Sequence, residues 1–352
     1  MDTRTILDFI ATTQLESLAD DYRALRERCG LVDRSQRGKL ALTGPGAVEF
    51  LNGQVTNELL DLRPGQGRYA AFLTNKGKML GDLRVLVVGG DDGEVSELLL
   101  DTERPALQAL FDMIRHYRIG YDVELHKRTL ERALYSLIGP HAAAVAARAA
   151  DIPVTELPSE EHDHLGATIA DTPVRLIATP DGLDVLCHAA AGEALAAALL
   201  DAGAEPVGEA AAEILRVERG RPRYGLDLDA DTIPQEAGLN DRAVSFTKGC
   251  YVGQETVARL YYRGRPNRHL RGLRLAPRAG VETADAEPPP PEPGAELRLG
   301  ERLVGRLGSV VLSPDLGPIG LALLRREATP GDVLAIGAHG ATAEVVELPF
   351  RS

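Results

Sequence analysis

The 352-residue sequence contains no tryptophan, and aromatic residues make up only 4% of the chain. The hydrophobic core must therefore be built mainly from aliphatic side chains. Only three cysteines are present, Cys29, Cys187 and Cys250, and they are far apart and odd in number. This pattern excludes a disulfide framework and favours a reducing compartment, so we expect a cytoplasmic protein.

Long hydrophobic runs are also missing. No segment approaches the roughly 18 consecutive apolar residues of a membrane-spanning helix, and the N-terminal stretch has no apolar signal-peptide core. We therefore expect neither a membrane anchor nor a secretion signal. The formal net charge of -13 argues against broad nonspecific binding to nucleic acids or anionic membranes. Small molecules and proteins are the expected partners.

The pattern of hydrophobic residues predicts an α+β protein with more than one domain, since the chain exceeds the size of one core. Over residues 1–262, strand-like and helix-like segments alternate, and RYAAFLTNKGKMLGDLRVL predicts two strands joined by a hairpin at Gly77. Residues 263–352 contain short β-branched runs between glycines and prolines, which is typical of a small barrel or sandwich. The proline-rich segment 281–296 is expected to be a loop in that β domain.

One short segment, KGCYVGQE at residues 248–255, places a cysteine between a lysine and two glycines, before a helix-like run. Glycines permit a sharp turn, and helix-end N–H groups with a neighbouring cation, here Lys248, favour the thiolate form of Cys250. A thiolate is a nucleophile and a metal ligand. The spacing alone leaves open that Cys250 is a buried residue filling a small space. Cys29, at a helix end, and Cys187, in an apolar run, favour packing roles.

Other kinds of site have little support in the sequence. No glycine-rich segment has the spacing of a dinucleotide-binding or phosphate-binding loop. The cluster EEHDH at residues 160–164 contains ligand-type side chains, but no spaced His pair or Cys accompanies it. We interpret it as a solvated turn and expect no metal site.

The segment KGCYVGQE resembles the signature of the YgfZ-type folate-binding proteins, whose mitochondrial relatives act in iron–sulfur cluster biogenesis. Much of the remaining chain, including LTGPGAVEFLNGQVTNEL, is similar to the aminomethyltransferase (glycine-cleavage T-protein) superfamily. The resemblance implies a three-lobed ring with two intertwined lobes in residues 1–262, a C-terminal β-barrel, and tetrahydrofolate or another reduced folate in the hole. The signature residues are Lys248, Gly249, Cys250, Tyr251, Gly253, Gln254, Glu255 and Arg259.

The resemblance also implies folate-binding positions. Tyr69 stands where the family has a tyrosine against the folate, and Asp82 corresponds to the acid that aminomethyltransferases use near the reacting folate nitrogen. Asp184 replaces a family glutamate that grips the pterin edge, and Ile177 replaces a family tyrosine, so the folate is expected to sit differently or bind more weakly. Arg216 matches a further family position, although an ion pair with a glutamate on its own helix explains it equally well.

Three functions follow as expectations. The first is a folate-binding protein that supports iron–sulfur cluster assembly or repair in client enzymes, with Cys250 as the reactive thiol and Lys248 as its activating cation. Because such clusters normally take four ligands, one thiolate implies a transient or shared contact with a client or assembly protein. The second is a folate-dependent aminomethyltransferase or demethylase that uses Asp82. The third is a folate sensor or scaffold without catalysis, so enzymatic activity stays undecided.

Overall fold

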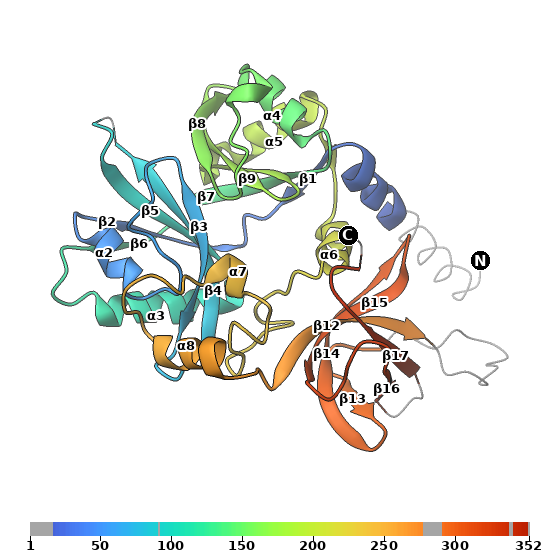
Figure 1. Ribbon diagram of the computed structural model, residues 1–352. Helices are drawn as coiled ribbons and strands as arrows, with labels where there is room; N and C mark the ends of the chain where they lie inside the picture. The colour runs from blue at the N-terminus through green and yellow to red at the C-terminus, as the bar shows by residue number, and fades with distance from the viewer. Residues whose placement is uncertain (1–16, 91, 277–290, 338–340, 351–352) are drawn as a thin grey trace.

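The computed structural model describes residues 17–90, 92–276, 291–337 and 341–350. Figure 1 shows three bodies, two α+β lobes and a β-barrel, joined by the segments that carry α6, α7 and α8. This arrangement confirms the expected α+β class with a C-terminal barrel. Residues 281–290 of the proline-rich segment lie outside the described residues, and β13 begins at its last residue, Glu296.

The first lobe is a five-stranded sheet in the order β3-β4-β5-β2-β6. Its strands are β2 (Gly38–Thr43), β3 (Gly67–Leu73), β4 (Met79–Gly89), β5 (Val95–Thr102) and β6 (Glu124–Lys127). Helices α2 (Ala47–Asn52) and α3 (Leu107–Tyr117), with the short turn η1 (Arg104–Ala106), cover one face. Helix α3 buries Leu110, Met113 and Ile114, whose spacing puts them on one helical face.

The hairpin predicted at Gly77 is confirmed. Strands β3 and β4 pair antiparallel, and Gly77 in the turn between them has φ of 77°, a conformation that glycine adopts at little cost. The hairpin places two of the expected folate-binding residues on adjacent strands, Tyr69 on β3 and Asp82 on β4.

The second lobe is a six-stranded sheet in the order β11-β1-β7-β10-β9-β8. Its strands are β1 (Gly30–Asp33), β7 (Arg132–Ile138), β8 (His164–Ile169), β9 (Thr172–Thr179), β10 (Gly182–His188) and β11 (Glu205–Pro206). Helices α4 (Ala142–Ala150) and α5 (Gly192–Asp201) cover it, with short turns η2 (Val154–Glu156) and η3 (Ala189–Ala191). The core includes Cys29 and Cys187, each 1% exposed, as the packing interpretation expects. The chain leaves this sheet after β1 and returns to it at β7, so the two lobes are intertwined.

A small apolar cluster joins the two sheets. It contains Ala41, Leu86 and Leu99 from the first lobe and Leu134, Ile177 and Leu186 from the second. Ile177, which stands at the position of a family tyrosine, is fully buried in this cluster and pairs with Asp184 on the neighbouring strand. Its apolar side chain is therefore explained by packing between the lobes.

The third body is a closed barrel in the order β12-β15-β14-β13-β16-β17. Its strands are β12 (Arg268–Ala276), β13 (Glu296–Leu299), β14 (Arg302–Ser313), β15 (Gly317–Arg325), β16 (Val333–Ile336) and β17 (Ala341–Val346). Three helices precede it: α6 (Glu209–Glu218), α7 (Asn240–Ala243) and α8 (Gln254–Arg263). The domain boundary that we propose after residue 262 falls at the end of α8.

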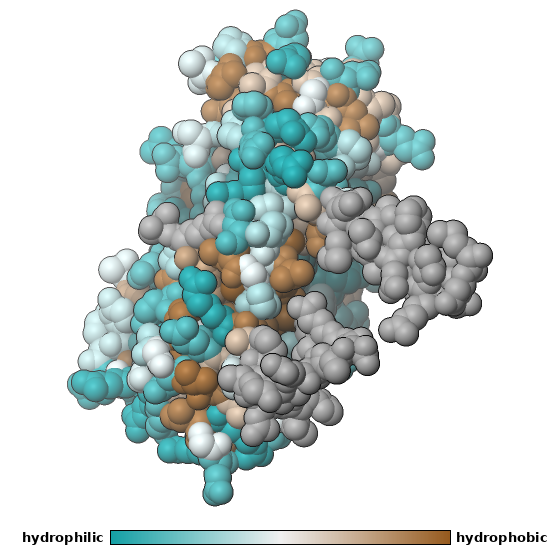
Figure 2. All heavy atoms as spheres, turned by 90° about the vertical axis from the view of Figure 1, so that its right-hand side faces the viewer, coloured by the Kyte–Doolittle hydropathy of each residue, from teal (hydrophilic) through white to brown (hydrophobic). Residues whose placement is uncertain are grey.

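The surface agrees with the composition. Figure 2 shows the face formed by the second lobe, above, and the barrel, below. Hydrophilic side chains are frequent on both, and hydrophobic side chains gather in the middle of this face. Among the described residues, no helix combines the length and the apolar character needed to cross a membrane.

Candidate functional site

The register of the first sheet places polar side chains side by side on one row. Arg84 of β4 lies opposite Tyr69 of β3 on one side and opposite Asp101 of β5 on the other. Asp101 in turn lies opposite Lys39 of β2. Because strand residues two positions apart share a face, Asp82 lies on the same side of β4 as Arg84. The row therefore gives this sheet a polar face that continues across four strands.

Tyr69 and Asp82 form a close pair on this row. The Tyr69 hydroxyl donates a hydrogen bond of 2.6 Å to Asp82 Oδ2. Burial raises the pKa of Asp82 to about 6, although the hydrogen bond from Tyr69 opposes the rise. Burial and the adjacent carboxylate likewise hold the pKa of Tyr69 well above its ordinary value. The pair therefore contains a buried carboxyl group that titrates close to neutral pH.

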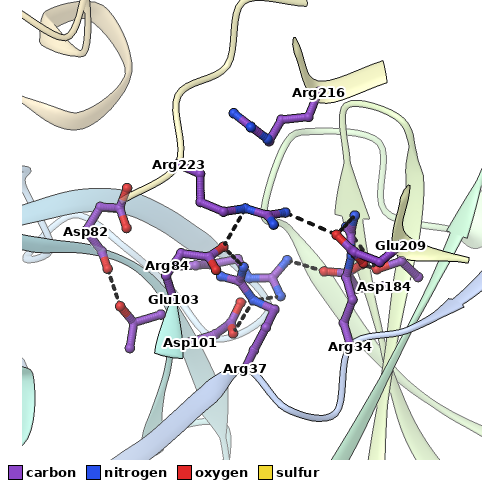
Figure 3. Close-up of polar contacts among 12 residues, drawn as sticks. Arg34, Arg37, Asp82, Arg84, Asp101, Glu103, Asp184, Glu209, Arg216 and Arg223 are labelled. Atoms are coloured by element: carbon purple, nitrogen blue, oxygen red, sulfur yellow. Dashed lines mark hydrogen bonds and ion pairs between the residues drawn. The ribbon is translucent and has the colours of Figure 1, made fainter. Parts of the chain in front are cut away.

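Beside this pair, arginines and carboxylates form a closed circuit that links the two lobes (Figure 3). We name it the ion-pair circuit. It runs through Arg84, Asp101, Arg37, Glu103, Arg223, Glu209 and Arg34, then through Ser136 to Asp184 and back to Arg84. Four arginines and four carboxylates alternate in it, so the formal charges cancel.

The circuit occupies both oxygens of Asp184. Arg84 Nη1 donates to Asp184 Oδ2 at 2.8 Å, and Ser136 Oγ donates to Oδ1 at 2.6 Å. The residue is only 7% exposed. Arg84, reaching across from the first sheet, therefore engages the carboxylate, and contact of Asp184 with a folate stays a prediction.

An open pocket of about 540 Å³ lies on the other side of Tyr69. We name it the Tyr69 pocket. Its lining residues are Asn57, Leu62, Gln66, Gly67, Arg68, Tyr69, Glu160, Glu161, His162, Asp163, Asp241 and Arg242. Of the three residues expected to line a folate cleft, Tyr69 alone belongs to this set, since Asp82 lies behind the Tyr69 hydroxyl.

The sequence cluster at residues 160–164 forms one wall of this pocket and is not a solvated turn. Glu161 accepts a hydrogen bond of 2.7 Å from Arg242 and also pairs with Arg221. His164 is 4% exposed, and the side chain of His162 is 13% exposed. The arginines come from segments far along the chain, so the local sequence contained no signal for this burial.

Arg216 serves the connection between α6 and the barrel. It pairs with Glu213 at 2.9 Å and Asp227 at 2.8 Å, and it donates to the Ser309 hydroxyl of β14. The alternative of an ion pair on its own helix is therefore observed with Glu213, while Glu218 accepts from Tyr22 and Ser313 instead. Arg216 does not belong to the lining of the Tyr69 pocket.

The signature segment forms a turn that leads into α8, as expected, with Gly249 and Cys250 exposed and Lys248 and Tyr251 buried. Cys250 is exposed, in contrast to Cys29 and Cys187. Gly253 has φ of 86°, and a Cβ atom there would lie 2.5 Å from the carbonyl oxygen of Thr74 and 3.2 Å from Cα of Gly77. Only glycine permits this approach, so the turn is held against the tip of the β3–β4 hairpin.

Lys248 holds the same turn from inside. Its ammonium group donates to the carbonyl oxygens of Asn52, Val55 and Asn57 at 2.7, 2.9 and 2.6 Å. Burial lowers its pKa to about 8. An ammonium group has three protons, so none is left for the Cys250 thiolate. Lys248 therefore anchors the turn, and its electrostatic support of the thiolate stays a prediction.

The other signature residues have structural positions around this turn. Tyr251 is buried with its ring 5.3 Å from the Lys248 ammonium, and burial raises its pKa to about 12. Gln254 closes the turn through a bond from Nε2 to the Gly249 carbonyl at 3.3 Å. Glu255 and Arg259 are exposed on α8, where a partner could reach them.

Comparison with known proteins agrees with this architecture. Residues 7–248 match the family described as the GCVT N-terminal domain, and residues 274–348 match the CAF17 C-terminal beta-barrel domain. The fold and site define an aminomethyltransferase-like protein, and the chain belongs to the GCVT family of the aminomethyltransferase superfamily. Members of this family use tetrahydrofolate.

Individual relatives extend the match over nearly the whole chain. An aminomethyltransferase of Synechococcus sp. (strain RCC307) is 32% identical over 96% of this chain and 91% of its own length. An aminomethyltransferase of Thermosynechococcus vestitus is 29% identical over 88% of this chain and 80% of its own. The crystal structure of the glycine cleavage system aminomethyltransferase T from Bartonella henselae superposes with a TM-score of 0.80 at 26% identity, covering 95% of this chain and 89% of that one.

Proposed function

We propose that this chain is a YgfZ-type, reduced-folate-binding protein that supports assembly or repair of iron–sulfur clusters in client proteins, with Cys250 as its reactive thiol. The observation that carries the proposal is the exposure of Cys250 on a fixed turn, while Cys29 and Cys187 are buried in a core. The match of the C-terminal barrel to the CAF17 barrel domain supports it further. A reducing compartment, the cytoplasm, suits a free exposed thiol.

The Tyr69 pocket fits a reduced folate in chemistry and size. Its volume of about 540 Å³ is in the range of small-molecule sites. The ring of Tyr69 offers an aromatic surface, and Arg68 and Arg242 in the lining, which pair with Asp61 and Glu161, are guanidinium groups that can also bind the carboxylates of the glutamate part of folate. Folate supplies a one-carbon carrier when bound; the residues of this chain bind and orient it.

The cluster or its iron is the cargo in this proposal. Cys250 would contribute one thiolate ligand, and the client or assembly protein would supply the others, because clusters of this kind normally take four thiolate ligands. The contact between Cys250 and the cluster therefore forms when the partner protein binds and is lost when the partner leaves. The close approach of Gly253 to Thr74 keeps the thiol on a rigid support while this happens.

Replacement of the chromosomal gene by the Cys250→Ser form tests the proposal. We expect the activities of several iron–sulfur enzymes to fall as far as in a deletion strain, while glycine cleavage and folate binding by the purified variant stay unchanged. Thr247→Ala, an exposed change in the same turn, is the matched control and should behave as the wild type. Normal activities of iron–sulfur enzymes in the Cys250→Ser strain would contradict the proposal. A folate sensor or scaffold would then remain among the expected functions.

A second candidate is folate-dependent one-carbon transfer, favoured by relatives that are named aminomethyltransferases. Here Asp82, with a pKa of about 6, would exchange a proton near the folate nitrogen at neutral pH. The Asp82→Asn strain separates the two candidates. Loss of glycine cleavage in this strain would select one-carbon transfer, whereas unchanged glycine cleavage would refute it; the thiol-dependent function is tested by the Cys250→Ser strain.

A further inference from the structure

His162 stands apart from the other polar residues of the Tyr69 pocket because one of its ring nitrogens lacks a partner. Its Nδ1 is buried and accepts no hydrogen bond from any described residue. Its Nε2 lies 3.5 Å from Glu161 Oε1. The imidazole faces the ring of Tyr69 with 6.3 Å between centroids. Buried polar atoms are nearly always paired, so an unpaired nitrogen in the wall of a pocket is a candidate hydrogen-bond acceptor for a ligand.

The protonation state of this histidine is determined by its surroundings. Burial, together with Arg84 and Arg242, lowers the pKa of His162 to about 4, so the imidazole is neutral at physiological pH. A neutral imidazole has one N–H donor and one acceptor nitrogen. Because Glu161 is a carboxylate on the Nε2 side, we assign the proton to Nε2. The orphan Nδ1 is then an acceptor that lacks a donor.

The rest of the wall holds this acceptor in place. Glu161 is fixed by Arg242 at 2.7 Å and by Arg221 at 3.4 Å. The guanidinium of Arg242 also lies 5.1 Å from the centre of the Tyr69 ring. His162 has φ of 77°, an uncommon conformation for a residue other than glycine, and such conformations persist where the surroundings impose them. The wall is thus built in one arrangement, and it presents a lone pair beside a flat ring.

We propose that His162 Nδ1 accepts a hydrogen bond from an N–H group of a flat, N–H-rich heterocycle, the pterin part of a reduced folate, bound in the Tyr69 pocket. This inference rests on the proposed folate binding and adds the residue that recognises the heterocycle. It reassigns that recognition from Asp184, whose oxygens are both engaged in the ion-pair circuit, to a residue of the second lobe on the pocket side. Specificity follows, because a ligand without such an N–H leaves Nδ1 buried and unpaired.

The test is calorimetric titration of the full chain with 5-formyltetrahydrofolate. His162→Phe keeps a flat ring and removes the acceptor, and we expect its affinity to fall by about 10-fold to 100-fold, the loss typical when one buried partner is removed. His162→Asn is the matched control, because Asn offers an acceptor oxygen in the place of Nδ1 and tolerates positive φ. We expect it to bind within a few-fold of the wild type.

A second ligand separates a local effect from a general one. p-Aminobenzoylglutamate lacks the pterin, so its affinity should be equal for the wild type and His162→Phe, and unequal values would overturn the assignment. Equal binding of 5-formyltetrahydrofolate by both proteins would also overturn it while leaving folate binding intact. A wild-type chain that binds no reduced folate would refute the proposed folate binding and this inference together. Circular dichroism at matched concentration establishes that both variants are folded.

Discussion

The ion-pair circuit and the Tyr69 pocket are neighbours that use polar residues in opposite ways. Arg84 belongs to the circuit and Tyr69 to the pocket, yet the two residues lie opposite each other on adjacent strands. In the circuit, each carboxylate has an arginine partner. In the pocket, the buried His162 Nδ1 has no hydrogen-bond partner among the described residues.

This difference separates carboxylates whose partners lie within the fold from a pocket atom that has none, although Arg84 Nε of the circuit also lacks a partner among the described residues. A paired buried network fixes one arrangement of the chain, here of two lobes, and leaves little for a ligand to bind. An unpaired atom in a preformed pocket wall contributes little to the stability of the fold but can contribute to the affinity for a ligand. Asp184 shows why the partners matter, because its family position implies a ligand contact while its carboxylate pairs with Arg84 of the other lobe.

The largest expected effect is on the circuit. Arg84→Met should lower the free energy of unfolding by about 3–5 kcal/mol, because it leaves the buried Asp101 and Asp184 without their shared cation. Urea unfolding followed by circular dichroism measures the change. Arg302→Met, which removes a solvent-exposed pair with Glu327, is the control and should cost less than about 1 kcal/mol. An equal loss of unfolding free energy in the two variants would refute the statement that the buried ion-pair circuit holds the fold together.

Asp82, between the circuit and the pocket, gives an effect that depends on pH. Its pKa in the folded protein, about 6, exceeds the ordinary value of 3.8, so the native state binds the proton more tightly than the unfolded state. The stability from this group is present below pH 3.8 and is lost as the pH rises through 6. Relative to Asp82→Asn, the wild type should lose up to about 3 kcal/mol between pH 4 and 7.

Unfolding titrations of both proteins across this pH range provide the measurement. The difference between them isolates the one carboxyl group, since the remaining titrating groups are common to both chains. A difference that stays constant with pH would mean that Asp82 is ionised in the folded protein as readily as in water. That result would also weaken the second candidate function, which needs this carboxyl group to exchange a proton near neutral pH.

The smallest effect on stability belongs to the pocket. Glu161→Gln should change the free energy of unfolding by less than about 1 kcal/mol, because its side chain is 33% exposed and its pairing with Arg242 is screened by water. Asp101→Asn is the same chemical change inside the circuit and should cost at least about 2 kcal/mol more, since Asp101 serves two arginines. Thermal unfolding of both variants sharpens the comparison, and a reversed order would refute it.

Local patterns in the sequence predicted the elements that depend on neighbours along the chain. The hairpin at Gly77, the helix after Gly253, the β-rich C-terminal domain and the burial of Cys29 and Cys187 all follow from periodicity and turn chemistry, whereas the choice of a barrel over a sandwich came from the family resemblance. The partners of charged residues did not follow. Asp184 meets Arg84 from the other lobe, and Glu161 meets Arg242 from a segment far along the chain.

The same limit applies to the hydrogen-bond partners of Lys248. Adjacency in sequence suggested that its cation lies beside the Cys250 thiol, but the long side chain reaches inward to carbonyls of residues 52–57. Side-chain direction depends on the tertiary packing of the turn, which a single sequence does not encode in any local pattern. Tyr69 and Asp82 were foreseen through family resemblance alone, and their hydrogen bond gives that resemblance a physical basis.

The intertwining of the two lobes has a consequence for how the chain is made. Strand β1 is released by the ribosome early, yet its antiparallel partner β7 and its parallel partner β11 come after the whole first lobe. Because domains fold from the N-terminus onward during synthesis, the first lobe can complete its sheet while β1 still lacks both of its pairing strands. We therefore expect the first lobe to fold before the second lobe, whose sheet is completed only when β7 and β11 have been synthesised.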